Sequence, residues 1–320
     1  MSRVLVTGGA GFIGSHLCEA LLARGDSVTA FDDFNEFYDP AIKRRNAAAL
    51  AKRKGFRLVE GDIRDAAAVD ALFSASRFDT VVHLAAMAGV RPSLEKPLLY
   101  DSVNVAGTIV LLEAARRHGS PRFVFGSSSS VYGASSRVPF REDDPADRPV
   151  SPYAATKRAG ELLAHNWHHL YGLDVVCLRF FTVYGPRQRP EMAIHKFARL
   201  IDRGEPVPLF GKGDSRRDYT YVSDIVGGVL GAMERPPGFS IYNLGESRTV
   251  SLLDLVRLLE KALGKEARLD HRPDQPGDVP ITYADVSRAR ADLRYDPRVG
   301  VEEGISLFVD WFRREGAAAR

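Results

Sequence analysis

Cysteine is scarce in this chain of 320 residues, which holds only Cys18 and Cys177, neither in a metal-ligand spacing. Two cysteines cannot form a disulfide framework, so the chain fits a reducing cytoplasm and predicts no bound metal. Long apolar runs are missing as well. No uninterrupted stretch approaches membrane-spanning length, and the first residues show no signal-peptide pattern, so we expect no membrane partner.

The chain also lacks an excess of charge of one sign. Its 44 Lys and Arg residues nearly balance 41 Asp and Glu residues, giving a net charge of +3, and the two signs are mixed along the sequence. This balance argues against a nucleic-acid partner. The length predicts about two domains, or one domain with an added lobe, and 45% apolar residues can fill a sizeable core.

Short β-branched runs alternate with helical patterns through the first half, which indicates a Rossmann-type α/β fold with a doubly wound parallel sheet over residues 1–180. The predicted strands are Arg3–Thr7, Ser27–Phe31, Arg57–Glu60, Thr80–Leu84, Arg122–Ser127 and Asp174–Arg179. The predicted helices between them are Ser15–Arg24, Ala66–Ser76, Asp101–His118 and Pro152–Tyr171.

The second half is richer in proline and in loop signals. It contains one clear amphipathic helix, Ser251–Gly264, in which Ser251 and Asp254 resemble a capping box with Asp in the Glu/Gln position. We therefore expect residues 181–320 to form a smaller substrate lobe whose segments interleave with the sheet.

A glycine-rich segment, Thr7–Gly14, follows the first predicted strand and opens a helix. Gly8 permits a tight turn, Gly11 lets backbone amides approach a pyrophosphate, and Gly14 allows close packing of helix on strand. With a strand before it and a helix after it, this segment predicts a dinucleotide site rather than an ordinary turn.

Asp32 ends the second predicted strand, where a carboxylate can bind the ribose hydroxyls of the adenosine. Asp33 adds a second negative charge, and no Arg or Lys stands beside Asp32 in the sequence to accept a 2′-phosphate. These residues favour NAD over NADP. Asp62 and Ile63, after the third strand, are placed to meet the adenine, although Gly61-Asp62 fits a simple turn equally well.

Tyr153 and Lys157 lie four residues apart on a predicted helix, so both project from one face. An ammonium group near a phenol stabilises the phenolate, so we expect the pKa of Tyr153 to be lowered. Such a tyrosine can take a proton from a sugar hydroxyl while a hydride leaves the same carbon. A Tyr-x-x-x-Lys spacing is common on solvated helices, but here it follows the glycine segment and the serine run 127–130.

These motifs together resemble the extended short-chain dehydrogenases/reductases that act on nucleotide sugars, over nearly the whole chain. The segments that carry the resemblance are His83–Ala86, Asn104, Ser128–Gly133, Tyr153 with Lys157, Arg179–Pro186, Arg217–Tyr219 and Gly277–Pro280. The resemblance implies that Ser128 orients the sugar O4, that Phe181 lies beside the nicotinamide, and that Arg217 pairs with a UDP diphosphate. Arg217 could instead form a surface ion pair with Asp214 or Asp218.

The resemblance also implies further contacts and a homodimer formed through the helices around Asp101–His118 and Pro152–Tyr171. The further cofactor contacts are Phe12, Ile13, Asn35, Leu84, Ala85, Ala86 and Asn104. The further substrate contacts are Arg91, Ser129, Ser130, Thr182, Arg189, Gln275 and Asp278.

The dehydratases and decarboxylases of this family carry an acid just before a Val-Tyr-Gly turn, whereas this chain has a serine run before Val131-Tyr132-Gly133. This difference favours an epimerase. The segments Tyr38–Arg44, Ala88–Arg91 and Phe180–Pro186 are similar to those of UDP-glucuronate 4-epimerases. The alternatives are a UDP-glucose/UDP-galactose 4-epimerase and, in another class, a non-catalytic NAD-binding protein on the same fold.

A substrate with a carboxylate needs groups that hold it. Oxidation of glucuronate at C4 gives a β-keto acid, which loses CO2 when the C5–carboxylate bond is parallel to the carbonyl π system. We expect Thr182 and Arg189 to hold the carboxylate out of that alignment. Arg91 and Arg187 are competing candidates, and Arg189 could instead be a solvated loop charge.

Overall fold

The computed structural model describes residues 1–119, 121–135, 137–273 and 279–318. A seven-stranded parallel sheet in the order β10-β6-β5-β4-β1-β2-β3 forms its centre. Its strands are β1 (Arg3–Thr7), β2 (Ser27–Asp32), β3 (Phe56–Glu60), β4 (Thr80–His83), β5 (Arg122–Ser128), β6 (Val175–Phe180) and β10 (Phe239–Leu244). The predicted doubly wound sheet is confirmed, and all six predicted strands are present with ends within one residue.

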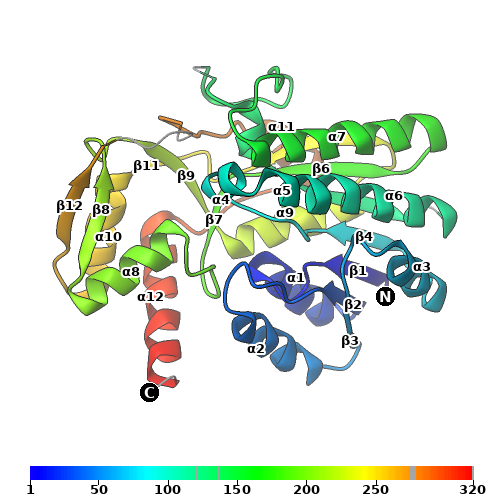
Figure 1. Ribbon diagram of the computed structural model, residues 1–320, viewed down its shortest axis with the longest axis horizontal. Helices are drawn as coiled ribbons and strands as arrows, with labels where there is room; N and C mark the ends of the chain where they lie inside the picture. The colour runs from blue at the N-terminus through cyan, green and yellow to red at the C-terminus, as the bar shows by residue number, and fades with distance from the viewer. Residues whose placement is uncertain (120, 136, 274–278, 319–320) are drawn as a thin grey trace.

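Helices cover both faces of this sheet (Figure 1). One face carries α3 (Ala66–Ala75), α6 (Gly107–Arg117) and α7 (Pro152–Tyr171), and the other carries α1 (Phe12–Ala23), α9 (Val222–Glu234) and, next to α1, α2 (Pro40–Ala51). The predicted limits of α7 are confirmed. Ser151 caps its start by accepting a hydrogen bond from the Ala154 amide at 3.2 Å, and Gly172 ends it in the left-handed conformation.

The predicted helix Asp101–His118 is divided in the structure. A short α5 (Pro97–Asp101) is followed by a π-helical turn, η1 (Ser102–Ala106), and then by α6. By length and composition, the helical segment Pro97–Arg117 could cross a membrane. Half of its most apolar stretch is buried within the protein, where α5, η1 and α6 pack against α7. It is therefore a core element of this fold.

The rest of the second half forms the smaller lobe at the left of Figure 1. It is built from a three-stranded sheet in the order β11-β9-β7, a two-stranded sheet β12-β8, and helices packed on them. The elements are β7 (Thr182–Tyr184), α8 (Ala193–Arg203), β8 (Pro206–Phe210), β9 (Arg216–Tyr221), β11 (Thr249–Ser251), α10 (Leu252–Leu263), β12 (Arg268–Arg272) and α12 (Val301–Ala318). α11 (Ser287–Leu293) instead packs against α9 and β10 of the large sheet. Two short elements complete the described chain, α4 (Val90–Glu95) and the 3-10 turn η2 (Ser129–Tyr132).

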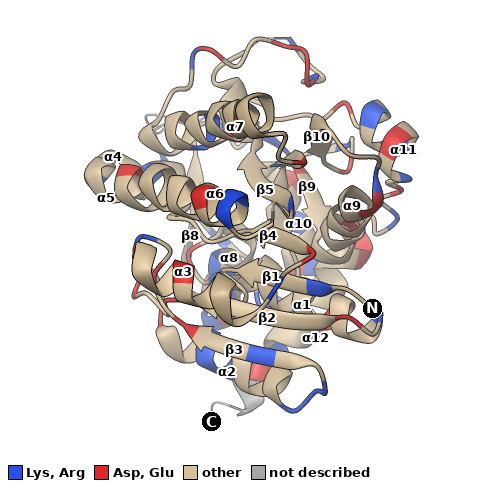
Figure 2. Ribbon diagram, turned by 90° about the vertical axis from the view of Figure 1, so that its right-hand side faces the viewer, with Lys and Arg blue, Asp and Glu red and all other residues tan. Residues whose placement is uncertain are grey.

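The boundary at residue 180 stays a prediction. β10 comes from the second half but pairs in parallel with β6 in the large sheet, so the two parts share this layer. The capping serine of α10 is present, since Ser251 Oγ accepts a hydrogen bond from the Asp254 amide at 3.0 Å. Charges of both signs are interspersed over the elements visible in Figure 2.

Candidate active site

A cavity of about 360 Å³ opens at the carboxyl ends of the central strands, where the order of the parallel sheet reverses between β1 and β4. Most of the predicted site residues line it. They are Gly8, Gly11, Phe12, Ile13, Gly14, Asp32, Asp33, Asn35, Asp62, Ile63, Leu84, Ala85, Ala86, Ser128, Ser129, Ser130, Tyr153, Lys157, Phe181, Thr182 and Arg189.

Three predicted residues do not line this cavity. Arg91 lies over the ring of Phe210, 4.9 Å from its centre, and Arg217 donates to the Arg216 carbonyl at 2.9 Å. Asn104 is buried, and its side chain bonds to both backbone polar groups of Met87 at 2.8 and 2.9 Å. The structure therefore gives Asn104 a role in positioning the loop after β4. Gln275 and Asp278 lie outside the described residues.

The glycine segment has the shape that a dinucleotide requires. A Cβ on Gly14 would stand 2.1 Å from the carbonyl oxygen of Gly8, and a Cβ on Gly8 would stand 2.9 Å from the amide nitrogen of Ala85. Gly11 begins α1 without a side-chain cap, so the first amides of the helix remain for a ligand at its positive end. The residues present fit the pyrophosphate of a dinucleotide.

The prediction that no basic side chain lies near Asp32 is wrong, because Lys43 comes close to it in the folded structure although it is distant in the sequence. Lys43 lines the same cavity, is buried, and donates a hydrogen bond to the Asn35 carbonyl at 3.0 Å. Burial raises the pKa of Asp32, and the charge of Lys43 opposes that rise most strongly. The Asp32 carboxylate already accepts from the amides of Ala10 and Phe34 at 3.0 Å each.

Lys43 could have been found from the sequence. Asp39-Pro40 is an N-cap followed by proline in the first turn of α2, and Asp39 accepts from the Ala41 amide at 2.9 Å. A helix that starts at this point carries Lys43 within its first turns, next to the loop that follows β2.

A turn begins at Asp62, whose carbonyl accepts a hydrogen bond from the Asp65 amide at 3.1 Å. Asp62 Oδ1 accepts a hydrogen bond from the Arg64 amide at 2.8 Å, and its carboxylate pairs with the Arg64 guanidinium at 2.5 Å. The hydrogen bond from Arg64 lowers the pKa of Asp62. Both Asp62 and Ile63 line the cavity, so their contact with an adenine stays a prediction.

Tyr153, Lys157 and Ser128 meet at the floor of the cavity. Lys157 Nζ donates to the Gly126 carbonyl at 2.7 Å and lies 5.1 Å from the centre of the Phe125 ring. Ser128 hydrogen-bonds to Tyr153 and also accepts from the Ser130 amide at 3.2 Å. The two hydroxyls therefore converge on the point where a sugar hydroxyl could be oriented and deprotonated.

The expected lowering of the Tyr153 pKa is wrong for the protein chain by itself. Burial raises the pKa of Tyr153, while the hydrogen bond from Ser128 and the charge of Arg189 only oppose this rise. Burial also lowers the pKa of Lys157 to about 8, against the opposing charge of Glu161. The Lys157 ammonium is bonded to the Gly126 carbonyl, so it does not stabilise the Tyr153 phenolate enough to offset the cost of burying that charge.

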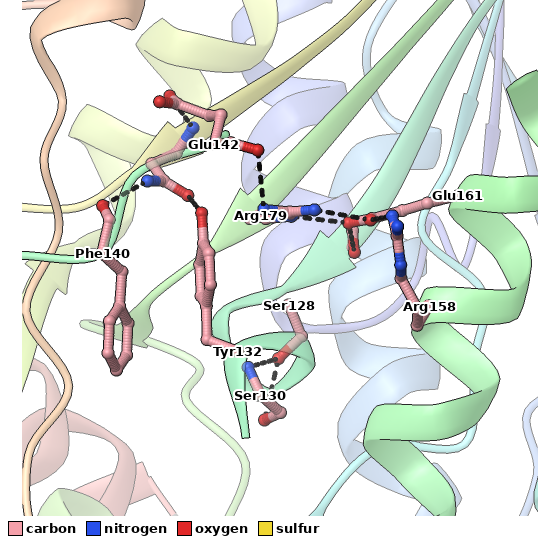
Figure 3. A network of polar contacts seen from close by, with 10 residues as sticks. Ser128, Ser130, Tyr132, Phe140, Glu142, Arg158, Glu161 and Arg179 are labelled. Carbon is pink, nitrogen blue, oxygen red and sulfur yellow. Dashed lines mark hydrogen bonds and ion pairs between the residues drawn. The ribbon is translucent and has the colours of Figure 1, made fainter. Parts of the chain in front are cut away.

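A buried ion pair supports this floor from behind (Figure 3). Glu161, one turn after Lys157, accepts from Arg179 Nε and Nη2 at 2.9 Å each and from Ser127 Oγ at 2.6 Å. Arg179 also lies 4.6 Å from the centre of the Tyr132 ring. This group joins α7, β5 and β6 directly beneath the serine run.

Arg189 and Thr182 line the cavity together, as the sequence predicts for groups that share a pocket. The Arg189 side chain is 20% exposed, pairs with Glu191 at 3.2 Å and lies 5.5 Å from the centre of the Phe37 ring. It is therefore largely enclosed and not a solvated loop charge. Arg187 instead reaches α1, where it pairs with Glu19 at 2.7 Å.

The fold and this site define an enzyme of the dinucleotide-binding type with a Ser-Tyr-Lys centre. The family model described as GDP-mannose 4,6 dehydratase matches residues 5–308. The chain belongs to this family of NAD-dependent nucleotide-sugar epimerases and dehydratases.

Individual relatives are similar over nearly the full length. UDP-glucuronate 4-epimerase of Thermodesulfobacterium geofontis is 41% identical over 312 residues, covering 97% of this chain and 96% of that protein. The structure of UDP-glucuronic acid 4-epimerase from Bacillus cereus with UDP-glucuronic acid and NAD has a TM-score of 0.92 and 37% identity, covering 98% of this chain and 99% of the other. UDP-glucose 4-epimerase of Thermus thermophilus with NAD has a TM-score of 0.89 and 37% identity, covering 97% and 99%.

Proposed function

We propose that this protein is an NAD-dependent isomerase that inverts C4 of a UDP-sugar, and that its substrate is UDP-glucuronate, which it converts to UDP-galacturonate. The observation that carries this proposal is one cavity that joins the glycine segment, the Ser128–Tyr153–Lys157 group and the enclosed Arg189. Its relatives named UDP-glucuronate 4-epimerase support the same substrate.

The protein's own groups perform the acid–base part of the reaction. NAD, when bound, supplies a reversible acceptor for the C4 hydride. Ser128 orients the O4 hydroxyl and Tyr153 takes its proton, while the ammonium of Lys157 stabilises the phenolate. If the 4-keto sugar turned about its diphosphate, the hydride would return to its opposite face, and Tyr153 would return the proton to O4. No net oxidation occurs, so NAD stays bound through turnover.

Cations gather beside the cavity at α8, where a diphosphate would need them. The charges of Arg91, Arg272 and Arg199 all act on Lys196, whose pKa burial and these neighbours lower. Arg189 and Met192, which immediately precede α8, line the cavity itself. This cluster supports a nucleotide diphosphate that enters from the smaller lobe.

The substrate is tested by incubating the protein separately with UDP-glucuronate and UDP-glucose and resolving the products. We expect UDP-galacturonate from the first and little product from the second. Arg189→Ala should weaken use of UDP-glucuronate selectively, by about 1.5–3 kcal/mol for a lost charge-assisted bond, or about 10- to 150-fold in kcat/KM. Arg187→Ala is the matched control, because Arg187 pairs with Glu19 outside the cavity. A wild-type preference for UDP-glucose, with equal effects of Arg189→Ala on both sugars, would favour the glucose/galactose alternative.

NAD should bind more tightly than NADP. A 2′-phosphate would meet the carboxylates of Asp32 and Asp33, while Lys43 is already occupied by the Asn35 carbonyl. Calorimetric titration of cofactor-free protein with each dinucleotide measures the difference, and Asp32→Asn should narrow it. Equal affinities in the unaltered protein would show that the acidic pair does not bind the ribose.

The homodimer and the cytoplasmic location stay predictions. Apolar side chains on the outer side of α7 support the dimer, since Leu162 and Leu170 are 56% and 58% exposed. These two leucines flank the exposed Asn166 on one side of α7, and such a mixed apolar and polar surface fits a second copy of the chain packed against it.

A further inference from the structure

A line of buried side-chain hydrogen bonds runs beneath the cavity, from the loops after β1 and β4 to the helix that carries Tyr153. Its members share almost complete burial, with exposed fractions of 7% or less. In order along the line they are Thr7, His83, Thr108, Asn104 and Thr156.

The donor and acceptor in each hydrogen bond of this line can be assigned by starting from the single proton of the Thr108 hydroxyl. Thr108 Oγ1 lies 2.6 Å from the Asn104 carbonyl oxygen, which can only accept, so Thr108 donates its single proton there. Thr108 Oγ1 must then accept from His83 Nε2, 3.0 Å away. The imidazole of His83 therefore carries a proton on Nε2.

The other ring nitrogen faces Thr7. The Ala85 amide donates to Thr7 Oγ1 at 3.2 Å, and the Thr7 hydroxyl lies 2.8 Å from His83 Nδ1. Burial and then the charge of Lys157 lower the pKa of His83 to about 3, so the ring is neutral at physiological pH. A neutral ring with its proton on Nε2 accepts at Nδ1, and the Thr7 hydroxyl donates to it.

The two ends of the line lie beside backbone of the site, the cofactor loops at one end and the Tyr153 carbonyl at the other. At one end, Gly8 and Ala85 both line the cavity and are so close that Gly8 has no room for a side chain. At the other end, Asn104 Nδ2 donates to Thr156 Oγ1 at 3.0 Å, and the Thr156 hydroxyl donates to the Tyr153 carbonyl at 2.9 Å. Each hydroxyl along the line donates to one acceptor, and the two protons of Asn104 Nδ2 go to the Thr156 hydroxyl and the Met87 carbonyl, so the direction of every bond is fixed.

We propose that His83 is a positioning residue, a neutral imidazole protonated on Nε2 that holds the two cofactor loops in register with the catalytic helix. Its hydrogen bonds join β1, β4 and the start of α6, and Asn104 in η1 passes the constraint to α7. A shift in this line moves the glycine segment relative to Tyr153, which changes the distance between the cofactor site and the acid–base group. Only the catalytic consequence of this proposal rests on the proposed function.

Nitrogen-15 NMR of the full-length protein tests the state of the ring directly. The spectrum of His83→Gln assigns the His83 signals by their absence. We expect a protonated Nε2 and an unprotonated Nδ1 that do not change between about pH 5 and 8, the range in which an unperturbed histidine titrates. A proton on Nδ1, or a ring that becomes charged in this range, would overturn the proposal.

Substitutions test the positioning role. Thr108→Val and His83→Leu should each lower kcat for UDP-glucuronate and the fraction of protein purified with NAD, by about ten-fold or more, because a buried polar group loses its partner. The KM for the sugar should stay unchanged, and Thr108→Ser should restore both values. Thr80→Val, which removes a buried hydroxyl at the far end of β4, is the matched control.

The outcomes separate the two proposals. If Thr108→Val and His83→Leu reduce only thermal stability and leave kcat and bound NAD as in the unaltered protein, His83 has no positioning role. If the unaltered protein converts no UDP-sugar, the proposed function fails, while the NMR spectrum and the retention of NAD still decide whether His83 holds the loops.

Discussion

We expect Tyr153→Phe to abolish epimerisation and to leave the fold and NAD binding intact. The substitution removes the phenolic hydroxyl that the structure places beside Ser128, in the cavity that Lys157 also lines. Loss of a positioned acid–base group lowers turnover by about 10²–10⁴-fold. The measurement is kcat with UDP-glucuronate, together with the amount of NAD that remains bound.

The matched control is Tyr171→Phe, which removes a hydroxyl from the half-exposed last residue of the same helix. This variant should turn over at the rate of the unaltered protein. Near-normal turnover by Tyr153→Phe would show that another group takes the O4 proton.

The pH dependence of turnover adds a second check. Because Lys157 has a pKa of about 8, turnover should fall as the pH rises past this value and the ammonium is lost.

Glu161→Ala should cause the largest loss of stability, about 3–5 kcal/mol in the free energy of unfolding. Arg179 is 1% exposed, so removal of Glu161 leaves a guanidinium buried without its partner. The same carboxylate also accepts from Ser127, which precedes the catalytic serine. Urea unfolding measures the loss.

Arg158→Ala is the control for this prediction. Arg158 pairs with Glu161 at 2.8 Å but is 28% exposed, so its loss should cost only about 0–1 kcal/mol. If both variants lowered the free energy of unfolding equally, the burial of Arg179 would not be the reason that Glu161→Ala is destabilising.

Acid should weaken the same pair. Burial alone would raise the pKa of Glu161, but the bonds from Arg179, Ser127 and Arg158 outweigh it and lower that pKa. A carboxylate with a lowered folded-state pKa contributes stability above its unfolded pKa and loses this contribution as the pH falls through the folded value. Glu161→Gln should therefore lose less stability than the unaltered protein over that acidic range.

The fold was predictable where local signals and sheet periodicity agreed. Ser151, Pro152 and Gly172 mark both ends of α7, and the apolar runs of β1, β4 and β5 indicate buried parallel strands. β10 was not predicted, because its sequence Phe-Ser-Ile-Tyr-Asn-Leu mixes polar and apolar residues after a proline pair. The π-helical turn η1 was not visible either, since one extra residue in a turn hardly changes a helical pattern.

The site was predictable where chemistry follows from spacing along one element. Gly8, Gly14, Tyr153 and Lys157 stand at spacings that a turn or a helix requires. Lys43 was missed although Asp39-Pro40 marks the start of its helix, because the approach of Lys43 to Asp32 depends on how α2 packs against α1 and β3. The raised pKa of Tyr153 was missed because desolvation depends on what surrounds a side chain in three dimensions.

The position of β10 has a consequence for synthesis of the protein on the ribosome. Val175, Val176, Cys177 and Leu178 of β6 have no exposed surface in the finished protein, and β10 covers their strand edge. A nascent chain that ends near residue 180 already contains the glycine segment and the Tyr-Lys pair, but it presents β6 as an open, apolar edge. The cofactor layer can close only after residue 244 has left the exit tunnel. Until then the half-made chain exposes the kind of apolar strand edge that in general promotes pairing with other strands.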